Sequence, residues 1–208
     1  MQTGGRKMED LYACENALRS QGISLICGID EAGRGPLAGP VCAAACLLPA
    51  GLVIDGLNDS KKLSEKRREA LYALITQQAL AWAVCLADEK TVDEINILQA
   101  TFRAMRGAVE KLPLRPELCL VDGNRDPGLG LPTRTVVKGD AKCACVAAAS
   151  ILAKVTRDRL MVEYDAQYPG YGFAIHKGYG TKAHYAAIDA LGLCPIHRRS
   201  FLKSHGPA

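Results

Sequence analysis

A chain of 208 residues with 49% hydrophobic residues can bury one sizeable core, which indicates an ordinary globular domain. No apolar run is long enough to span a membrane, and the polar N-terminus lacks the apolar region of a signal peptide, so we expect a cytoplasmic protein with no membrane partner. The net charge is only +4, but residues 134–208 carry 11 Lys and Arg against 5 Asp and Glu, which favours a polyanionic partner.

The hydrophobic pattern predicts strands that alternate with helices, which is typical of one α/β domain. In chain order, the pattern predicts a helix over 8–20, strands over 25–30 and 41–48, a helix capped by Ser64 that runs to 79, a strand over 82–87, a helix over 98–111, strands over 118–121 and 135–138, and helices over 141–161 and 181–191. In the helix that Ser64 caps, Leu71, Leu74 and Ile75 are predicted to form the inner face.

The nine cysteines do not form a recognisable framework. Their number is odd, no C-x-x-C motif occurs, and most of them lie inside apolar runs. We therefore interpret them as small buried hydrophobic residues in a reducing compartment, rather than as disulfides or zinc ligands.

Acidic residues stand at the ends of three predicted strands. Asp30 and Glu31 end the first strand, Asp122 ends another, and Asp140 lies just past a shorter one. Sites in open α/β sheets form at the carboxyl ends of the strands, so acids from distant parts of the chain can meet there.

Each acid also has a structural explanation, which the residues alone leave open. Asp30 and Glu31 can simply open a solvated turn, and Asp122 can form an Asx turn. Asp140 stands where a helix N-cap belongs.

Four carboxylates at one edge would repel one another unless cations held them together. Oxygen ligands of this kind suit Mg²⁺ or Mn²⁺. Two such ions about 4 Å apart can activate water and stabilise the leaving oxygen of a phosphodiester. A phosphodiester nuclease therefore fits both the acids and the basic C-terminal third.

The residues around these acids resemble ribonuclease HII, the bacterial type 2 ribonuclease H. The resemblance rests on seven motifs in the order of the family: Gly28–Pro40, Leu57–Ser64, Asp122–Asn124, Val137–Asp140, Ala148–Asp158, His176–Thr181 and His197–Phe201. They span nearly the whole chain. One departure is Cys145, which takes the position of a Glu that relatives more usually carry.

The resemblance implies a ribonuclease H-like α/β fold, in which helices flank a mixed central sheet and the C-terminal part is helical. It implies one catalytic domain over 1–208, with 1–24 as an N-terminal extension and about 165–208 as a substrate-binding region. The implied activity is metal-dependent endonucleolytic hydrolysis of the RNA strand of RNA–DNA hybrids, with cleavage at the 5′ side of ribonucleotides embedded in duplex DNA. This activity would leave 3′-OH and 5′-phosphate ends and serve ribonucleotide removal in DNA replication and repair.

The family's site residues carry over by position. The catalytic and metal-binding residues are Asp30, Glu31, Asp122 and Asp140. The substrate-binding residues are Gly33, Arg34, Gly35, Lys61 and Tyr179. The Gly-Arg-Gly turn matches the segment that reads the ribose 2′-OH, since glycines let the backbone approach closely and the arginine can reach a phosphate. The tyrosine matches the residue that packs on the neighbouring sugar, and a packing tyrosine is its structural alternative.

Other polar residues receive simpler interpretations. Lys61 and Lys62 are predicted phosphate contacts, with a solvated pair as the alternative. Asp158 is interpreted as structural and paired with a nearby Arg, and His176 as a loop anchor. Arg198 and Arg199 are predicted to lie on the basic surface that binds nucleic acid.

Two functions remain at this point. The first is a two-metal ribonuclease that acts as a monomer on RNA–DNA hybrids and on DNA duplexes that contain ribonucleotides. The second is a non-catalytic nucleic-acid-binding domain of the same fold. The intact acids favour the first, because a pure binder gains nothing from four carboxylates beside phosphates.

Overall fold

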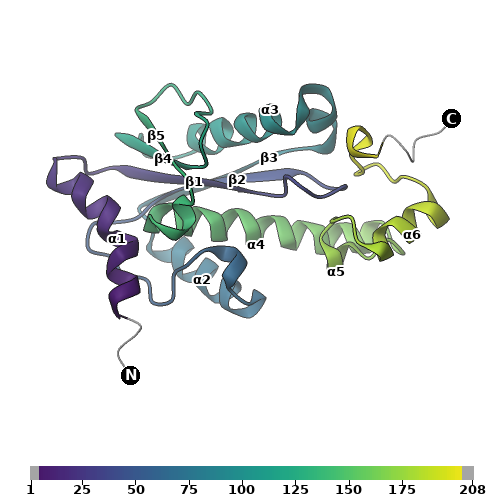
Figure 1. The fold of residues 1–208 in the computed structure, drawn as a ribbon, viewed down its shortest axis with the longest axis horizontal. Coiled ribbons are helices and arrows are strands. Elements are labelled where there is room, and N and C mark those ends of the chain that lie inside the picture. The colour runs from purple at the N-terminus through teal and green to yellow at the C-terminus, as the bar shows by residue number, and fades with distance from the viewer. Residues whose placement is uncertain (1–4, 203–208) are drawn as a thin grey trace.

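The computed structural model describes residues 5–202, of which 5–10 are described by their backbone alone. Five strands form one mixed sheet in the order β3-β2-β1-β4-β5 (Figure 1). They are β1 (Ile26–Ala32), β2 (Val41–Leu47), β3 (Ala81–Ala87), β4 (Leu118–Asp122) and β5 (Thr133–Val136). β2 runs antiparallel to both of its neighbours, β1 and β3, whereas β1, β4 and β5 are parallel. The predicted mixed α/β sheet is confirmed, with the last strand two residues earlier than predicted.

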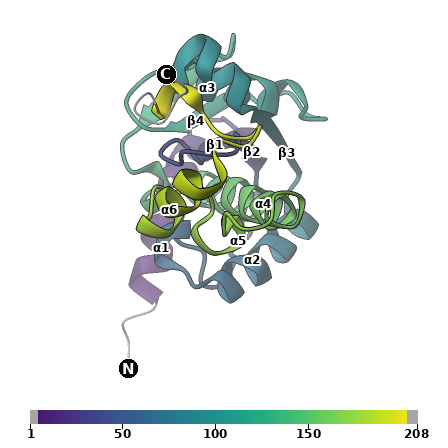
Figure 2. The ribbon, with the colours of Figure 1, turned by 90° about the vertical axis from the view of Figure 1, so that its right-hand side faces the viewer.

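Helices cover both faces of the sheet (Figures 1 and 2). On one face lies α3 (Glu89–Glu110), and across the other runs α4 (Ala144–Gln167), with α2 (Glu65–Gln78) packed against it. The helix α1 (Gly5–Ser20) lies at one end of the molecule, and α5 (Phe173–His176) and α6 (Lys182–Leu191) lie at the other. All seven residues of β2 are buried, which explains why its sequence is apolar throughout. Within residues 5–202, no helix has the length and apolar character needed to cross a membrane.

The first turns of α4 lie very close to β1. A Cβ atom added at Gly28 would stand 2.1 Å from the carbonyl carbon of Cys145, so only glycine fits there. Three buried alanines, Ala147, Ala148 and Ala149, continue this surface of small side chains. Close contact with the middle strand fixes α4, and with it the segment just before α4, relative to the acidic end of β1.

Several predicted helices differ from the observed ones at their ends. The helix predicted over 98–111 is the second part of α3, which begins at Glu89 and is kinked at Asn96, with φ at 66°. Asn96 Oδ1 accepts the amides of Leu98 and Gln99, so this residue caps the second part. The helix predicted over 141–161 begins only at residue 144 and continues to 167.

One predicted inner-face residue was wrong. Leu71 and Ile75 of α2 are fully buried, but Leu74 is 37% exposed. The cap of this helix was predicted correctly, because Ser64 Oγ accepts the amide of Arg67.

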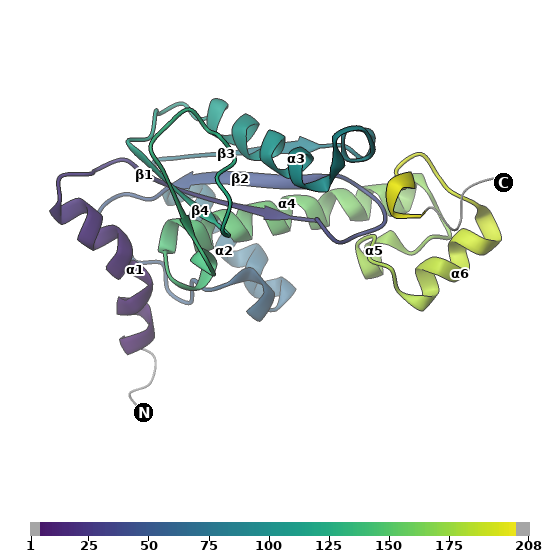
Figure 3. The ribbon, with the colours of Figure 1, turned by 45° about the horizontal axis from the view of Figure 1, so that its top comes forward.

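The C-terminal part packs against the turn that follows β1 (Figure 3). Its small core contains Tyr171 and Phe173, whose rings stack with centroids 5.2 Å apart. The same cluster includes Leu37 and Ala38 of the turn. This contact positions the segment around Tyr179 beside the end of β1.

Candidate active site

The register of the sheet places Asp30 and Asp122 next to each other. The paired residues of β1 and β4 end at Ile29 and Val121, so the two aspartates come next in line on their parallel strands. Asp30 still pairs with β2, where it lies opposite Ala44. The carboxyl ends of neighbouring parallel strands thus bring together acids that are 92 positions apart in the chain.

Asp140 approaches the same edge from the segment before α4. It lies in the short 3₁₀ helix Gly139–Ala141, and the amide of Gly139 donates to Asp122 Oδ1 at 2.6 Å. The N-cap of α4 is Cys143. The capping explanation for Asp140 is therefore wrong, and its buried carboxyl, 6% exposed, belongs to the acidic edge.

A fifth acid, Asp59, joins this group and was missed in the sequence. Its Oδ1 accepts the amide of Lys61 at 2.9 Å, and its carboxyl contacts that of Asp140. In the sequence, Asp59 looks like an ordinary residue of a polar loop. Nothing in its spacing signals the contact with an acid more than 80 positions away.

The acids influence one another's protonation. Burial raises the pKa of the Asp30 carboxyl well above its usual range, and the charges of Glu31 and Asp122 raise it further. Burial also raises the pKa of Asp140, to which the charges of Asp59 and Asp122 contribute. These carboxyls are therefore close enough to repel one another when ionised.

This set of donors fits a hard divalent cation. Burial lowers the pKa of the Lys61 ammonium, but the charges of Asp30, Asp140 and two further acids outweigh it, and the pKa is raised overall. Lys61 and Arg34 together offset only part of the negative charge of the five acids at this edge. Carboxylate oxygens are the ligands that Mg²⁺ and Mn²⁺ prefer, so Asp30, Glu31, Asp122 and Asp140 fit either ion.

A cavity of about 190 Å³ collects the predicted substrate-binding residues. Its lining includes Glu31, Gly33, Arg34, Gly35, Lys61 and Tyr179. A second cavity, of about 380 Å³, is also lined by Glu31 and Arg34, and it extends to Asp122 and to α3. The two cavities share Glu31 and Arg34 in their linings. The Oε1 atom of Glu31 and the Nη1 atom of Arg34 are 3.5 Å apart. The acidic edge therefore opens onto a groove that the predicted residues line.

Two buried arginines hold the turn between β1 and β2. Arg198 donates hydrogen bonds of 2.6–3.0 Å to four main-chain carbonyls, those of Gly33, Arg34, Pro36 and Gly39. Arg157 donates to three more, those of Ala38, Pro40 and Lys177. A Cβ atom at Gly33, where φ is +94°, would lie 2.0 Å from Arg157 Nε, so this position requires glycine. The turn is thus shaped by side chains that bind its backbone.

Arg198 was interpreted wrongly as a residue of the nucleic-acid surface. Its side chain is fully buried, whereas the neighbouring Arg199 is exposed. A pair of adjacent arginines looks like surface charge in a sequence, and only the fold shows that Arg198 points inward to four main-chain carbonyls of the turn. Arg157 was missed because a lone arginine beside Asp158 also looks like surface charge.

The loop that carries Tyr179 is anchored by histidines. His184 Nδ1 lies 3.0 Å from the carbonyl of Tyr179, and its Nε2 lies 3.1 Å from His197 Nε2. The amide of Gly178 donates to His176 Nδ1 at 3.2 Å, which confirms His176 as a loop anchor. Burial lowers the pKa of His184 to about 4, so this ring is neutral at pH 7. The Tyr179 side chain itself remains 44% exposed.

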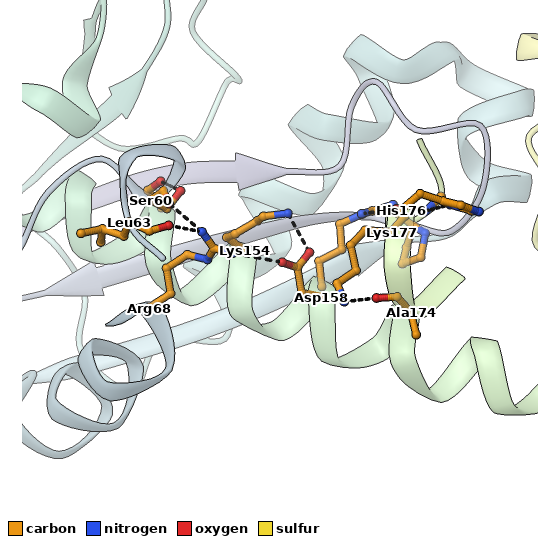
Figure 4. A network of polar contacts seen from close by, with 12 residues as sticks. Ser60, Leu63, Arg68, Lys154, Asp158, Ala174, His176 and Lys177 are labelled. Atoms are coloured by element: carbon orange, nitrogen blue, oxygen red, sulfur yellow. Dashed lines mark hydrogen bonds and ion pairs between the residues drawn. The ribbon is translucent and has the colours of Figure 1, made fainter. Parts of the chain in front are cut away.

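The loop that carries Lys61 is held by a network around Asp158 (Figure 4). Asp158 lies 2.7 Å from Lys154 Nζ and 3.9 Å from Arg68 Nη2. Arg68 Nη1 in turn donates to the carbonyls of Ser60 and Leu63. The predicted pairing of Asp158 with an Arg is confirmed, although the lysine is its closer partner.

The sequence of this chain matches those of known proteins over most of its length. A family model for ribonuclease HII matches residues 27–204. The ribonuclease HII of Citrifermentans bemidjiense is 58% identical over 201 residues, which cover 96% of this chain and 87% of that protein. The ribonuclease HII of Dechloromonas aromatica is 59% identical over 179 residues, which cover 86% of this chain and 91% of that protein.

Solved structures agree with these relatives. The crystal structure of ribonuclease H2 from Pyrococcus horikoshii OT3 matches with a TM-score of 0.73 and 28% identity, covering 86% of this chain and 94% of that one. The ribonuclease H-like fold is thereby confirmed. The family match spans most of the chain, including every acid of the site, so this chain belongs to the ribonuclease HII family and is an endoribonuclease.

Proposed function

We propose that the chain hydrolyses the RNA strand of RNA–DNA hybrids and cuts duplex DNA at the 5′ side of an embedded ribonucleotide, leaving 3′-OH and 5′-phosphate ends. This activity would serve ribonucleotide removal in DNA replication and repair, by a monomer in the cytoplasm. The observation that carries the proposal is the acidic edge of Asp30, Glu31, Asp122 and Asp140, of which Glu31 lines the same cavity as Gly33–Gly35 and Tyr179 and, with Asp122, the adjoining one.

The acidic edge would hold two Mg²⁺ or Mn²⁺ ions, with Asp30, Glu31, Asp122 and Asp140 as ligands. Bound there, such ions supply an activated water and stabilise charge on the leaving oxygen. The chain's own residues position these carboxylates before substrate arrives. The amide of Gly139 orients Asp122, and the amide of Glu31 donates to Asp30 Oδ1 at 2.7 Å.

Recognition of the ribonucleotide would come from the turn after β1. With no side chains at Gly33 and Gly35, main-chain groups can approach a 2′-OH, which alone distinguishes RNA from DNA at one nucleotide. Arg34 and Lys61 line the same cavity and would bind the phosphates that flank it. Tyr179 would pack on the next sugar.

Cleavage of a duplex that contains one ribonucleotide tests the proposal directly. We expect one cut, 5′ of the ribonucleotide, in Mg²⁺ or Mn²⁺, and none in EDTA or with an all-DNA duplex. Binding to all of these duplexes without cleavage in either ion would instead support a non-catalytic binding domain.

Hybrid binding should weaken steeply with salt, because each lysine or arginine on a phosphate displaces a counterion. We expect Arg34→Ala and Lys61→Ala each to reduce the slope of log Kd against log salt by about one. Fluorescence anisotropy in Ca²⁺, chosen to limit cleavage, measures this slope. Lys90→Ala, on α3 in a separate cavity that none of the predicted substrate-binding residues lines, is the matched control and should leave the slope unchanged. An unchanged slope in both test variants would remove these residues from the phosphate contacts.

Tyr179→Ala should impair cutting at a single ribonucleotide more than cutting within a long hybrid. A lone ribonucleotide offers one 2′-OH, whereas a continuous RNA strand offers many registers and can compensate. If the sugar contact is comparable to base stacking, its loss costs roughly 1–3 kcal/mol, or about ten- to a hundredfold in kcat/KM.

The comparison uses kcat/KM on both substrates. Ile175→Ala, at a side chain that is 88% exposed on α5, is the control and should leave both values unchanged. Tyr179→Phe keeps the ring and should retain most of the activity. Equal losses on the two substrates in Tyr179→Ala would show that the tyrosine supports only the fold.

A further inference from the structure

A cluster of two thiols and a carboxylate lies where α1 meets the start of α4. The Sγ atoms of Cys14 and Cys143 and a carboxylate oxygen of Glu15 all lie within 4.8 Å of one another. Among the residues that the structure describes, no other three His, Cys, Asp or Glu side chains converge this closely, the acidic edge included. The three residues come from two helices, so the fold and not local sequence brings them together.

Glu15 is an unusual residue to find here, because its side chain is only 2% exposed. Its Oε1 accepts the amide of Cys145 at 2.7 Å, in the first turn of α4. Its Oε2 is buried and has no hydrogen-bond partner. Capping of α4 explains the first oxygen but not the second, and an unpartnered buried carboxylate oxygen is costly.

We propose that Cys14, Glu15 and Cys143 bind one Zn²⁺ ion. Two thiolates and a carboxylate form a ligand set that suits zinc and discriminates against Mg²⁺. The bond of Glu15 Oε1 to the Cys145 amide orients the carboxylate, which leaves Oε2 as the ligand. The ion thus gives a partner to the Glu15 oxygen that has no hydrogen bond.

The dimensions and charges suit this ion. In a tetrahedral site with Zn–S bonds of about 2.3 Å and a Zn–O bond of about 2.1 Å, the two sulfurs lie about 3.8 Å apart and a sulfur and an oxygen about 3.6 Å, so the cluster needs to contract by about 1.2 Å at most. Cys14 is partly exposed, which gives the ion an entry path and leaves room for water as fourth ligand. The three anionic ligands leave one negative charge beside Zn²⁺, and the nearby ammonium of Lys142 offsets it.

Such a site would join the N-terminal helix to the main domain. Cys143 is the N-cap of α4 and follows the 3₁₀ helix that carries Asp140 by two residues. Among the side chains of α1 that the structure describes, Tyr12 and Arg19 are further polar anchors: the Tyr12 hydroxyl accepts the amide of Ile54, and Arg19 donates to the carbonyl of Leu48. The zinc would therefore be structural, distinct in chemistry from the ions of the acidic edge.

Co²⁺ substitution tests the proposal in the full-length protein under reducing conditions. Thiolate ligands give Co²⁺ an intense near-ultraviolet charge-transfer band, which the oxygen ligands of the acidic edge cannot produce. We expect this band to saturate at one Co²⁺ per chain and to vanish when Zn²⁺ is added. Asp30→Asn and Cys85→Ser, the latter a partly exposed cysteine outside the cluster, are controls that should keep the band.

The variants Cys14→Ser, Cys143→Ser and Glu15→Gln should weaken Co²⁺ binding about tenfold or more. Alkylation of the wild type gives a second readout that does not depend on the folding of variants. Zn²⁺ should protect Cys14 from iodoacetamide, and a chelator should restore its reactivity. The proposal is overturned if the wild type shows no such band, if Cys14 and Cys143 form a disulfide under these conditions, or if Zn²⁺ leaves the alkylation of Cys14 unchanged.

Discussion

Asp30→Asn will lower cleavage of a single-ribonucleotide duplex by about a thousandfold or more. Each metal-bound carboxylate contributes several kcal/mol of transition-state stabilisation, and about 4 kcal/mol corresponds to three powers of ten in rate. Single-turnover kinetics in Mg²⁺ measure the effect. Retention of more than about a tenth of the wild-type rate would mean that Asp30 is not a ligand.

The same substitution should stabilise the protein in EDTA. The folded pKa of Asp30 is raised by burial and by Glu31 and Asp122, above the ordinary value of 3.8. The folded state therefore binds a proton that the unfolded state has released, and stability falls as pH rises from about 4 through the raised folded pKa. Asn cannot ionise, so the unfolding free energy of Asp30→Asn should fall less over this range. Urea unfolding at several pH values, with wild type alongside, measures the difference.

Arg198→Met will destabilise the protein by about 3–5 kcal/mol and nearly abolish cleavage. The substitution leaves four carbonyls of the turn after β1 without these donors, three of them in buried contacts, and each unsatisfied buried group costs about 1–3 kcal/mol before the structure relaxes. Displacing the turn by even 1 Å would lower the rate about a hundredfold. Denaturant unfolding and kcat/KM on a single-ribonucleotide duplex measure the two effects.

The neighbouring Arg199→Met provides the control. This side chain is exposed, and the contact of residue 199 with Asp93 uses the main-chain amide, so stability should change by no more than about 0.5 kcal/mol. Arg198→Lys should lie between the two, because an ammonium has three donors for four carbonyls. If Arg198→Met were as stable as Arg199→Met, the buried arginine would not hold the turn.

The sheet and the acidic edge could be predicted because their determinants are local. Apolar runs that stop at an acid, such as the one ending at Asp30, predict both a strand and a candidate site at its end. The motifs then identified the family, and the family match indicated a metal-binding role for Asp140. Spacing alone had left open that Asp140 is a helix N-cap. Substrate binding by Tyr179 and the glycine turn stays a prediction, although one cavity brings these residues together.

What could not be predicted depends on contacts between distant segments. Arg198 and Arg157 look like surface charges in the sequence, and their partners are main-chain carbonyls, which carry no residue signature. Asp59 meets Asp140 only because the loop before α2 folds back onto the start of α4. The cysteines were expected to be small buried hydrophobic residues, and Cys27 and Cys46 fit that expectation. Cys143, however, lies beside a buried carboxylate.

The contacts that hold the turn after β1 determine which of its residues can be substituted. Arg157 and Arg198 donate hydrogen bonds only to main-chain carbonyls. They therefore do not constrain which side chains these residues carry, apart from the glycines that the backbone conformation requires. Arg34 can therefore be exchanged without loosening the turn. If Arg34 binds a substrate phosphate as proposed, the strength of substrate binding can be altered at that position without changing the contacts that support the turn.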